Sequence, residues 1–344
     1  AVSLVLLVGG ATLMWCLNFY PDPVMEVTVH CKSGAPKLQV GERASLLSWN
    51  IQYAASRNYH FWYDGGDAVH VKERHVHETL GRLAKVIAAR SPQILLLQEV
   101  DRDSARTHRI DQLPALVRAN AARCWASTTY HRSRYVPAPL SHPLGRVDMH
   151  LATTSTFKMS RAQRHALPQL DEFFVRKAFN LKRAILEVHL PIKGKKQPLV
   201  LLNTHLSAFS FGDGTLNRQV QKILSRIQKL DDLGAPWILA GDFNMIPPGE
   251  DPARLGGEAH HYSDKKNPLV RLFKRFQVDT PLEEYKKKPS QYYTYLRHGS
   301  KAPDRKIDYI FTSPKVRIHE FKVLREESPA SDHLPLWMLF SVME

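Results

Sequence analysis

The chain has 344 residues, of which 43% are hydrophobic and 24% are charged, so it can bury a large core as one big α/β domain or two ordinary ones. Disordered and fibrous proteins are excluded by that composition, and three cysteines exclude a framework of several disulfides, although Cys31 and Cys124 can form one bridge in an oxidising compartment. The formal charge of +15 favours polyanionic partners, such as nucleic acid or the anionic surface of a membrane.

Residues 1–20 carry no charged side chain and are rich in Leu and Val, with Trp15, Phe19 and Tyr20 where an aromatic belt would lie. The stretch exceeds the apolar region of a signal peptide and lacks a clear cleavage site, so we expect an uncleaved transmembrane anchor. Residues 21–43, rich in Pro and Gly, are predicted to form a tether, and residues 44–344 a globular domain. A large domain after one N-terminal span is most simply placed on the non-cytoplasmic side of the membrane.

The globular part begins with a predicted β-α-β unit. Residues 45–50 form a strand that ends on Asn50, and a long polar and aromatic connection covers residues 53–71. Apolar residues at helical spacing predict a helix over residues 72–90, which Ser91-Pro92 stops. Residues 93–99 form the next buried strand, which ends on the carboxylate of Glu99.

The middle of the chain alternates further helices and strands. We predict helices over residues 110–122 and 215–230, a loop over 130–146, and strands over 147–154, 183–190 and 199–205. The last of these strands is a continuous apolar run that ends on His205.

A short apolar strand beginning at Trp237 stops abruptly at Gly241 and delivers Asp242 and Asn244 into a turn. Strands are then predicted over residues 306–312, 316–324 and 336–342. Ser331-Asp332-His333 leads into the last of them.

Polar side chains therefore recur where apolar strands end or begin. In a layered α/β fold such ends gather at one edge, where ligands bind. Each residue has an ordinary structural explanation, as a turn former or a satisfied histidine, but the recurrence favours a functional site. The residues are Asn50, Glu99, His205, Asp242, Asn244, Asp308, Asp332 and His333.

Six short motifs resemble, in order, those of the endonuclease/exonuclease/phosphatase superfamily, which includes DNases and neutral sphingomyelinases. The motifs are Ser48-Trp-Asn50, Gln98-Glu99, Asn203-Thr-His-Leu206, Gly241-Asp-Phe-Asn244, Lys306-Ile-Asp308-Tyr and Ser331-Asp-His333. The resemblance covers about residues 44–342 and implies a four-layer α/β sandwich, with two mixed β-sheets packed face to face and helices outside. It also implies that residues 44–344 are a catalytic domain that hydrolyses phosphoesters with a bound metal.

The resemblance implies a role for each residue type. Phosphoester hydrolysis needs a cation on the phosphate oxygens and a positioned water, and Mg²⁺, with Mn²⁺ as an alternative, suits oxygen ligands. The metal would be held by Glu99 and Asn50, with Asp332 as a further ligand. The catalytic roles would fall on Asp242 for the water, Asn244 and His205 for the phosphate, and His333 held by Asp308.

Two departures from the superfamily pattern limit what it implies. Gln52 stands where abasic-site endonucleases have Asp, which weakens a repair-nuclease interpretation. The stretch Leu151-Ala-Thr-Thr-Ser-Thr156 replaces a Leu-Ser-Arg pattern, so no catalytic residue is assigned there.

The substrate is less closely defined by the sequence. Tyr59, Phe61 and Trp62 follow the strand that carries Asn50, so we expect them to overhang the site as substrate-binding residues, with Arg146 contacting phosphate. The alternative is that these rings pack on the domain itself.

Our first hypothesis is a membrane-anchored phosphodiesterase that acts on a phospholipid headgroup or another phosphorylated metabolite. This hypothesis accounts together for the apolar N-terminus, the basic charge and the aromatic connection. The alternatives are a secreted or surface nuclease that hydrolyses DNA or RNA and, less favoured, a non-catalytic protein that binds phosphorylated ligands.

Overall fold

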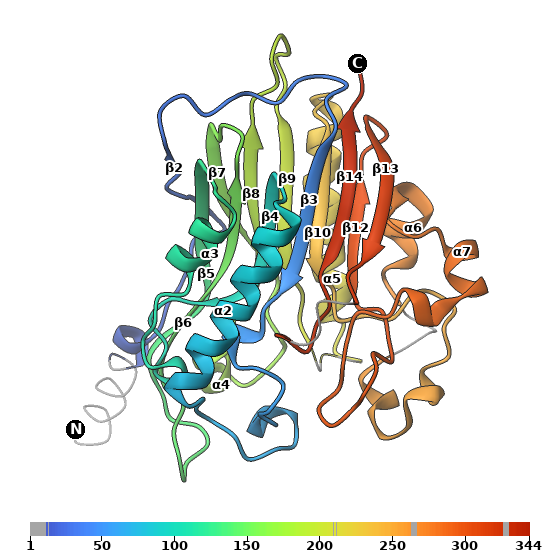
Figure 1. Ribbon diagram of the computed structural model, residues 1–344. Coiled ribbons are helices and arrows are strands. Elements are labelled where there is room, and N and C mark those ends of the chain that lie inside the picture. The colour runs from blue at the N-terminus through green and yellow to red at the C-terminus, as the bar shows by residue number, and fades with distance from the viewer. Residues whose placement is uncertain (1–11, 13, 209, 211, 263–266, 326–329) are drawn as a thin grey trace.

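The computed structural model describes residues 12, 14–208, 210, 212–262, 267–325 and 330–344. Two seven-stranded mixed sheets form its centre (Figure 1). One sheet has the order β1 (Val24–Glu26), β7 (Arg161–Ala166), β8 (Ala184–Leu190), β9 (Leu199–His205), β10 (Trp237–Asp242), β12 (Asp308–Thr312), β11 (Gln277–Val278). The other has the order β13 (Val316–Val323), β14 (Leu336–Val342), β3 (Ala44–Asn50), β4 (Ile94–Asp101), β6 (Gly145–Ser155), β5 (Cys124–Val136), β2 (His30–Cys31).

Helices lie on the outer sides of the two sheets, so the predicted four-layer α/β sandwich is confirmed. The α-helices are α2 (Glu73–Arg90), α3 (Leu113–Ala119), α4 (Phe174–Phe179), α5 (Thr215–Asp232), α6 (Val270–Arg275) and α7 (Leu282–Lys287). Short 3₁₀ turns are η1 (Gln52–Ala54), η2 (Trp62–Asp64), η3 (Ala105–Thr107), η4 (Pro252–His261) and η5 (Pro289–Gln291).

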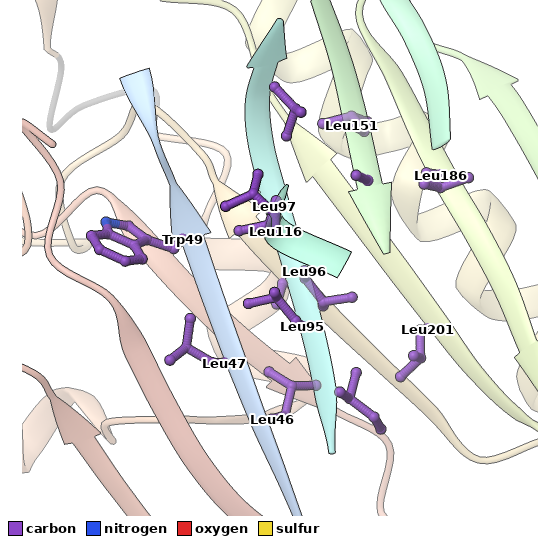
Figure 2. Packing of buried hydrophobic residues seen from close by; sticks show 14 of the residues in the cluster. Leu46, Leu47, Trp49, Leu95, Leu96, Leu97, Leu116, Leu151, Leu186 and Leu201 are labelled. Atoms are coloured by element: carbon purple, nitrogen blue, oxygen red, sulfur yellow. The ribbon is translucent and has the colours of Figure 1, made fainter. Parts of the chain in front are cut away.

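The apolar runs in the sequence are continuous because both faces of these strands are covered. Along β9, Leu199 and Leu201 pack in the core between the sheets, while Val200 and Leu202 pack toward α5. The same alternation runs along the neighbouring parallel strand β10. Figure 2 shows leucines of β3 and β4 meeting leucines of the opposite sheet. Side chains at every second position of these strands therefore face the space between the sheets.

A buried amide pair ties the two sheets together close to their functional edge. Gln98 on β4 donates its side-chain N–H to Asn203 Oδ1 at 2.7 Å, and Asn203 on β9 donates to the carbonyl oxygens of Leu97 and Ala152 at 3.0 and 2.9 Å. Because a buried amide without partners costs free energy, these bonds fix the relative position of the two sheets.

Most elements predicted from periodicity are present. The strands predicted over residues 199–205 and 336–342 coincide with β9 and β14, and the helices predicted over 72–90 and 215–230 correspond to α2 and α5. The loop predicted over 130–146 is wrong in part, because residues 130–136 continue β5 and β6 begins at residue 145. β5 pairs with β6 through two register irregularities and carries several polar residues, which hide the strand pattern.

Residues 21–43, predicted to form a tether, contribute one edge strand to each sheet. β1 pairs with β7 and β2 pairs with β5, and a disulfide joins Cys31 to Cys124. Leu38 is fully buried in the main core. The short pairings and the covalent link hold this segment against the domain.

The predicted anchor over residues 1–20 lies for the greater part outside the described residues. Among the described residues, no helix is both long enough and apolar enough to span a membrane.

Candidate active site

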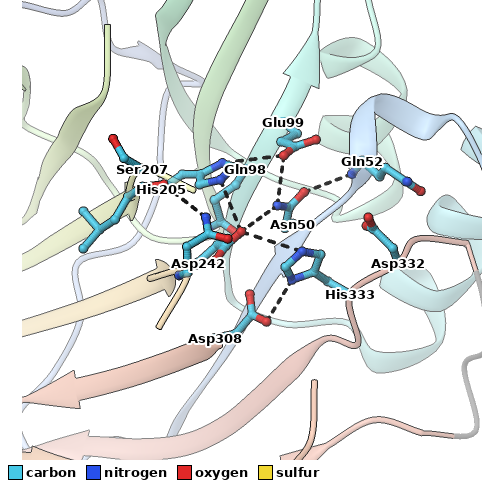
Figure 3. A network of polar contacts seen from close by, with 12 residues as sticks. Asn50, Gln52, Gln98, Glu99, His205, Ser207, Asp242, Asp308, Asp332 and His333 are labelled. Carbon is cyan, nitrogen blue, oxygen red and sulfur yellow. Dashed lines mark hydrogen bonds and ion pairs between the residues drawn. The ribbon is translucent and has the colours of Figure 1, made fainter. Parts of the chain in front are cut away.

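The candidate site lies between the two sheets at the edge where β3, β4, β9 and β10 end (Figure 3). Ile238 and Ala240 of β10 face the core between the sheets. Because every second side chain of a strand faces the same side, Asp242 also points into this space. Asp308 of β12 lies two residues before Ile310, which faces the core, so Asp308 also points inward. It is the residue on β12 that pairs with Asp242 of β10. Because side chains alternate between the two faces of a strand, polar residues that are far apart in the sequence meet in one buried cluster.

Asp242 occupies the centre of the cluster. Its Oδ2 lies 3.1 Å from Asn50 Nδ2, 3.2 Å from His205 Nε2 and 3.7 Å from His333 Nε2. Its Oδ1 accepts a hydrogen bond from the backbone N–H of Asn244 at 2.9 Å. Burial raises the pKa of Asp242 to about 7, because water no longer solvates the carboxylate.

His333 is held in place by groups on both sides of its ring. Its Nδ1 lies 2.9 Å from Asp308 Oδ2, which also accepts from the Thr294 hydroxyl at 2.6 Å. The backbone oxygen of His333 accepts from the indole N–H of Trp49 at 2.8 Å. Burial by itself would lower the pKa of His333, but the charges of Asp308 and Asp242 outweigh it and raise that pKa well above its usual value. The imidazolium is therefore the stable form of this ring in the cluster.

Glu99 reaches the site through an irregularity in β4. The register between β4 and β6 shifts between Leu97 and Val100, and Glu99 has a positive φ of 57°. Such a bulge redirects a side chain at some cost in backbone strain. The Glu99 carboxylate lies 3.2 Å from Asn50 Nδ2 and 3.7 Å from His205 Nδ1.

Asn50, Asn244 and Asp332 complete the predicted set. Asn50 turns its amino group toward Glu99 and Asp242, while its Oδ1 accepts from the backbone N–H of Gln52 at 3.0 Å. Asn244 has a positive φ of 52° and donates its side-chain N–H to the carbonyl of Leu206 at 3.1 Å. The structure thus brings the polar residues predicted at the strand termini together, with Asp332 at the margin of the group (Figure 3). Asn244 joins them through its backbone N–H, which donates to Asp242.

Glu99, Asp332 and Asn50, which the resemblance names as metal ligands, give one side of the cluster two carboxylates and an amide, and Glu99 contacts Asn50 at 3.2 Å. Burial raises the pKa of Glu99 and also raises that of Asp332 to about 6, with the charge of Glu99 adding to the second increase. A cation would offset this unfavourable accumulation of negative charge, and oxygen ligands are those that Mg²⁺ prefers. Asn50 could act as a ligand only after its amide turns to present Oδ1.

Asp242, Asp308 and His333 form a second group whose ligand atoms lie within 4.8 Å of one another and could also hold a metal. We favour the Glu99 side, because His333 Nδ1 and Asp308 Oδ2 already contact each other at 2.9 Å.

The structure adds two buried residues that the sequence did not single out. Tyr130 on β5 places its hydroxyl 3.1 Å from His205 Nδ1. The guanidinium of Arg183 lies 5.6 Å from the Tyr130 ring, and its Nη1 has no hydrogen-bond partner among the described residues. Arg183 is only 8% exposed, so its guanidinium is a buried cation close to the Tyr130 ring. The position of Arg183 immediately before an apolar strand was the one available signal, whereas Tyr130 was hidden in the supposed loop.

The aromatic connection after β3 packs largely on the domain, which is the alternative that the sequence left open. Phe61 is buried in the main core, so its ring is not available to a substrate. Trp62 packs beside Val69, and the Tyr59 hydroxyl contacts His75 Nδ1 at 2.8 Å. Tyr63 is instead 46% exposed, with its hydroxyl turned in to contact that of Tyr53 at 2.5 Å.

Arg146, predicted to contact phosphate, forms an ion pair with Asp103 at 2.6 Å. This partner already satisfies its charge, in contrast to Arg183. The predicted role of Arg146 in substrate binding therefore has no support from its surroundings.

Gly241 allows β10 to approach β9 immediately before Asp242. A Cβ atom at this position, where φ is +145°, would lie 1.8 Å from the carbonyl oxygen of Thr204. We expect Gly241→Ala to lower the free energy of unfolding by at least about 3 kcal/mol and to displace Asp242, since both backbones must move. Gly81→Ala in α2, where a Cβ meets open space, should instead stabilise by about 0.5–1 kcal/mol. Urea unfolding of both variants tests this, and equal stability of the two would contradict the packing argument.

The sequence matches the model of the Endonuclease/Exonuclease/phosphatase family over residues 47–333. None of the curated proteins matches it closely enough to count as a relative. The family match spans the strands and loops that carry the polar cluster, from β3 to His333.

Solved structures show the same fold at low sequence identity. An endonuclease/exonuclease/phosphatase from Beutenbergia cavernae DSM 12333 aligns with a TM-score of 0.61 and 21% identity, covering 88% of this chain and 72% of that chain. The catalytic domain of human Nocturnin with a bound sulfate anion aligns with a TM-score of 0.56 and 19% identity, covering 92% of this chain and 97% of that chain. A family protein from Leptotrichia buccalis C-1013-b aligns with a TM-score of 0.55 and 16% identity, covering 87% and 99%.

Proposed function

The chain belongs to the endonuclease/exonuclease/phosphatase family, and from that premise we propose that it is a divalent-metal-dependent phosphodiesterase acting on a phosphorylated headgroup at a membrane. The observation that carries the hydrolytic part is the surroundings of Asp242. One carboxylate is shared by Asn50, His205 and His333, beside an oxygen-rich group that suits a cation. The carboxylate can activate a water molecule, and the histidines and the amide can stabilise an anionic transition state.

Each polar residue has a part that follows from its contacts. Asp242 orients the attacking water and accepts its proton, because its carboxylate is fixed by an amide and a backbone N–H. His333, held by Asp308, donates to a phosphoryl oxygen from Nε2. His205, with Nδ1 beside Tyr130 and Nε2 beside Asp242, stabilises the phosphate from the other side, and the buried cation of Arg183 adds positive charge behind it.

Glu99, Asn50 and Asp332 would hold the divalent metal ion. When bound, that ion supplies positive charge to the phosphate oxygens and lowers the cost of negative charge in the transition state. Mg²⁺ and Mn²⁺ are the ions that a set of oxygen ligands favours, because no thiolate lies among these residues.

The loops around the site favour a small phosphorylated group over a nucleic-acid duplex. The loop after β3 contacts the loop before β12, where the rings of His60 and His298 stack with centroids 4.7 Å apart. Arg57 of the first loop also donates to the carbonyl of Ser300 in the second. One side of the site is therefore closed by protein, which a bulky duplex would have to displace.

A position outside the cytoplasm is part of the proposal. The Cys31–Cys124 disulfide supports it, because structural disulfides persist in oxidising compartments. Residues 1–20, which carry no charged side chain, are the proposed means of attachment to a membrane.

The substrate is tested by comparing phospholipid vesicles with plasmid DNA at equal enzyme and Mg²⁺ concentrations. We expect release of headgroup from vesicles of phosphatidylcholine and phosphatidylglycerol to exceed plasmid cleavage. Asp242→Asn is the matched control, since it should abolish the release without unfolding the protein. Strong plasmid cleavage with no release of headgroup would contradict the proposal and favour a nuclease.

A further inference from the structure

Large apolar side chains are exposed together near the active-site end of the molecule. Trp15, Leu140, Phe173 and Phe174 are 67%, 90%, 71% and 61% exposed. Exposed rings and leucines in one region of a protein mark a binding surface, whereas isolated ones are ordinary. We call these four residues the exposed apolar surface.

The exposed apolar surface is assembled around the second half of β5. On one side the N-terminal segment joins this strand, where Asn18 bridges to Ser133 and the Ser133 hydroxyl donates to the Leu17 carbonyl at 3.3 Å. On the other side His131 Nε2 contacts the carbonyl of Phe179, at the end of α4, at 3.0 Å. β5 then runs into the β5–β6 connection that carries Leu140. Figure 1 shows the N-terminal segment, α4 and this connection at one end of the sandwich.

The residues below the surface are firmly held, which keeps the apolar side chains turned outward. The Phe19 ring lies 5.6 Å from the guanidinium groups of both Arg132 and Arg164. Lys182 donates to the carbonyls of Ala178 and Asn180 at 3.2 Å each and to that of Lys177, which fixes the end of α4. Phe173 and Phe174 lie at the opposite, N-terminal end of this short helix, where the Lys177 N–H donates to the Phe173 carbonyl at 3.0 Å.

Charge complementarity identifies the partner as an anionic surface. Arg134 and Arg176 are exposed beside the apolar side chains, and the whole chain carries a formal charge of +15. Two acidic residues are also near, Asp171, which is exposed, and Glu172, which accepts a hydrogen bond from Asn180 at 2.7 Å. Rings and leucines surrounded by arginines are typical of proteins that insert shallowly into an anionic bilayer.

We propose that the exposed apolar surface docks on an anionic lipid bilayer and turns the active site toward the lipid headgroups. The docking does not depend on the proposed function, whereas its use for a lipid substrate does. β5 links the two regions, because Tyr130 contacts His205 in the site and Tyr135, which is 47% exposed, follows five residues later. At about 3.4 Å per residue, the headgroups would lie roughly 17 Å from the catalytic cluster along this strand.

Environment-sensitive labels on the full-length protein test the docking. With Cys16→Ser as background, since Cys16 is the free exposed cysteine among the described residues, single variants Leu140→Cys, Phe174→Cys and Leu233→Cys are labelled with a nitrobenzoxadiazole dye. Leu233 is the matched control, because it is 58% exposed but lies before β10, at the opposite end from Asp242. The labelled proteins are mixed with vesicles of phosphatidylcholine and phosphatidylglycerol that carry a spin-labelled lipid as quencher.

We expect blue-shifted and quenched fluorescence at positions 140 and 174, and neither effect at 233. No quenching at 140 and 174, equal quenching at 233, or equal quenching on vesicles of phosphatidylcholine alone would overturn the proposal. A blue shift at 140 and 174 without vesicles would overturn it in favour of self-association.

A combined Leu140→Ser, Phe173→Ser and Phe174→Ser variant separates docking from catalysis. It should weaken vesicle binding at least about tenfold, since each serine removes a side chain that the membrane would bury. Turnover of the soluble diester bis(p-nitrophenyl) phosphate should remain within about twofold, because these residues lie outside the catalytic cluster. Quenching on vesicles without hydrolysis of the lipid would sustain the docking and refute the lipid substrate.

Discussion

Asp242→Asn is expected to lower kcat on bis(p-nitrophenyl) phosphate by about a hundredfold or more while the protein stays folded. The amide keeps the shape of the side chain but neither accepts a proton nor carries the charge that faces His205 and His333. The measurement is kcat at saturating Mg²⁺, with the melting temperature as a check on folding. His333→Ala should cause a loss of similar size, and the double variant should lose less than the product of both, because the two groups act together.

Asp232→Asn is the matched control for this prediction. Asp232 ends α5, and in the described structure its carboxylate accepts a hydrogen bond from Gln228 at 2.9 Å, near the start of β10, whereas Asp242 lies at the other end of that strand. This variant should keep its full rate. A near-native rate in Asp242→Asn would remove Asp242 from the catalytic group.

Glu99→Gln should raise the Mg²⁺ concentration needed for half-maximal activity at least about tenfold, because it removes a full negative charge from the proposed metal site. Asp242→Asn should change that concentration much less, since Asp242 acts on water in this account. Residual activity in Glu99→Gln should therefore recover in part when Mg²⁺ is added. Recovery of this kind distinguishes a ligand of the metal from a group that transfers a proton.

Glu78→Gln on α2 serves as the control for charge, because Glu78 is exposed on the helix surface. Its Mg²⁺ dependence should equal that of the unaltered protein. An unchanged Mg²⁺ dependence in Glu99→Gln would contradict the assignment of Glu99 to the metal.

The sequence predicted the position of the polar cluster because its residues stand at the ends of strands with a strong local pattern. β9 and β10 are continuous apolar runs, buried on both faces, and each ends with a polar side chain at an inward position. Strand periodicity then fixes the direction of His205 and Asp242 without any knowledge of distant contacts. The pairing of β3 with β14 brings His333 close to Asn50, and the resemblance, not periodicity, anticipated that contact.

Residues whose position depends on irregular backbone or on distant contacts were not predictable. Tyr130 lies on β5, at the start of a stretch whose Pro and Arg residues suggested a loop. The neighbouring sequence does not show that Arg146 forms an ion pair with Asp103. Nor does it show that Nη1 of Arg183 has no hydrogen-bond partner among the described residues. That difference arises only when separate strands pack together.

The aromatic connection after β3 shows a further limit of sequence patterns. Phe61, Trp62 and Tyr63 are consecutive, yet one is buried in the main core, one packs in a smaller cluster and one is exposed. Composition predicted an aromatic loop near the site, but the direction of each ring depends on a tight turn with Gly65 at a positive φ of 83°. Local composition did not specify that turn.

The central claim, hydrolysis of a phosphodiester that depends on a divalent metal ion, is tested most directly by removing and restoring that ion. Full-length protein is treated with EDTA, dialysed exhaustively and assayed on bis(p-nitrophenyl) phosphate, alone and with added Mg²⁺ or Mn²⁺. We predict that turnover falls to the background rate of Asp242→Asn and returns when either ion is added, because the inferred ligands offer only oxygen atoms. Undiminished turnover after dialysis, or no turnover with either ion present, would contradict the account.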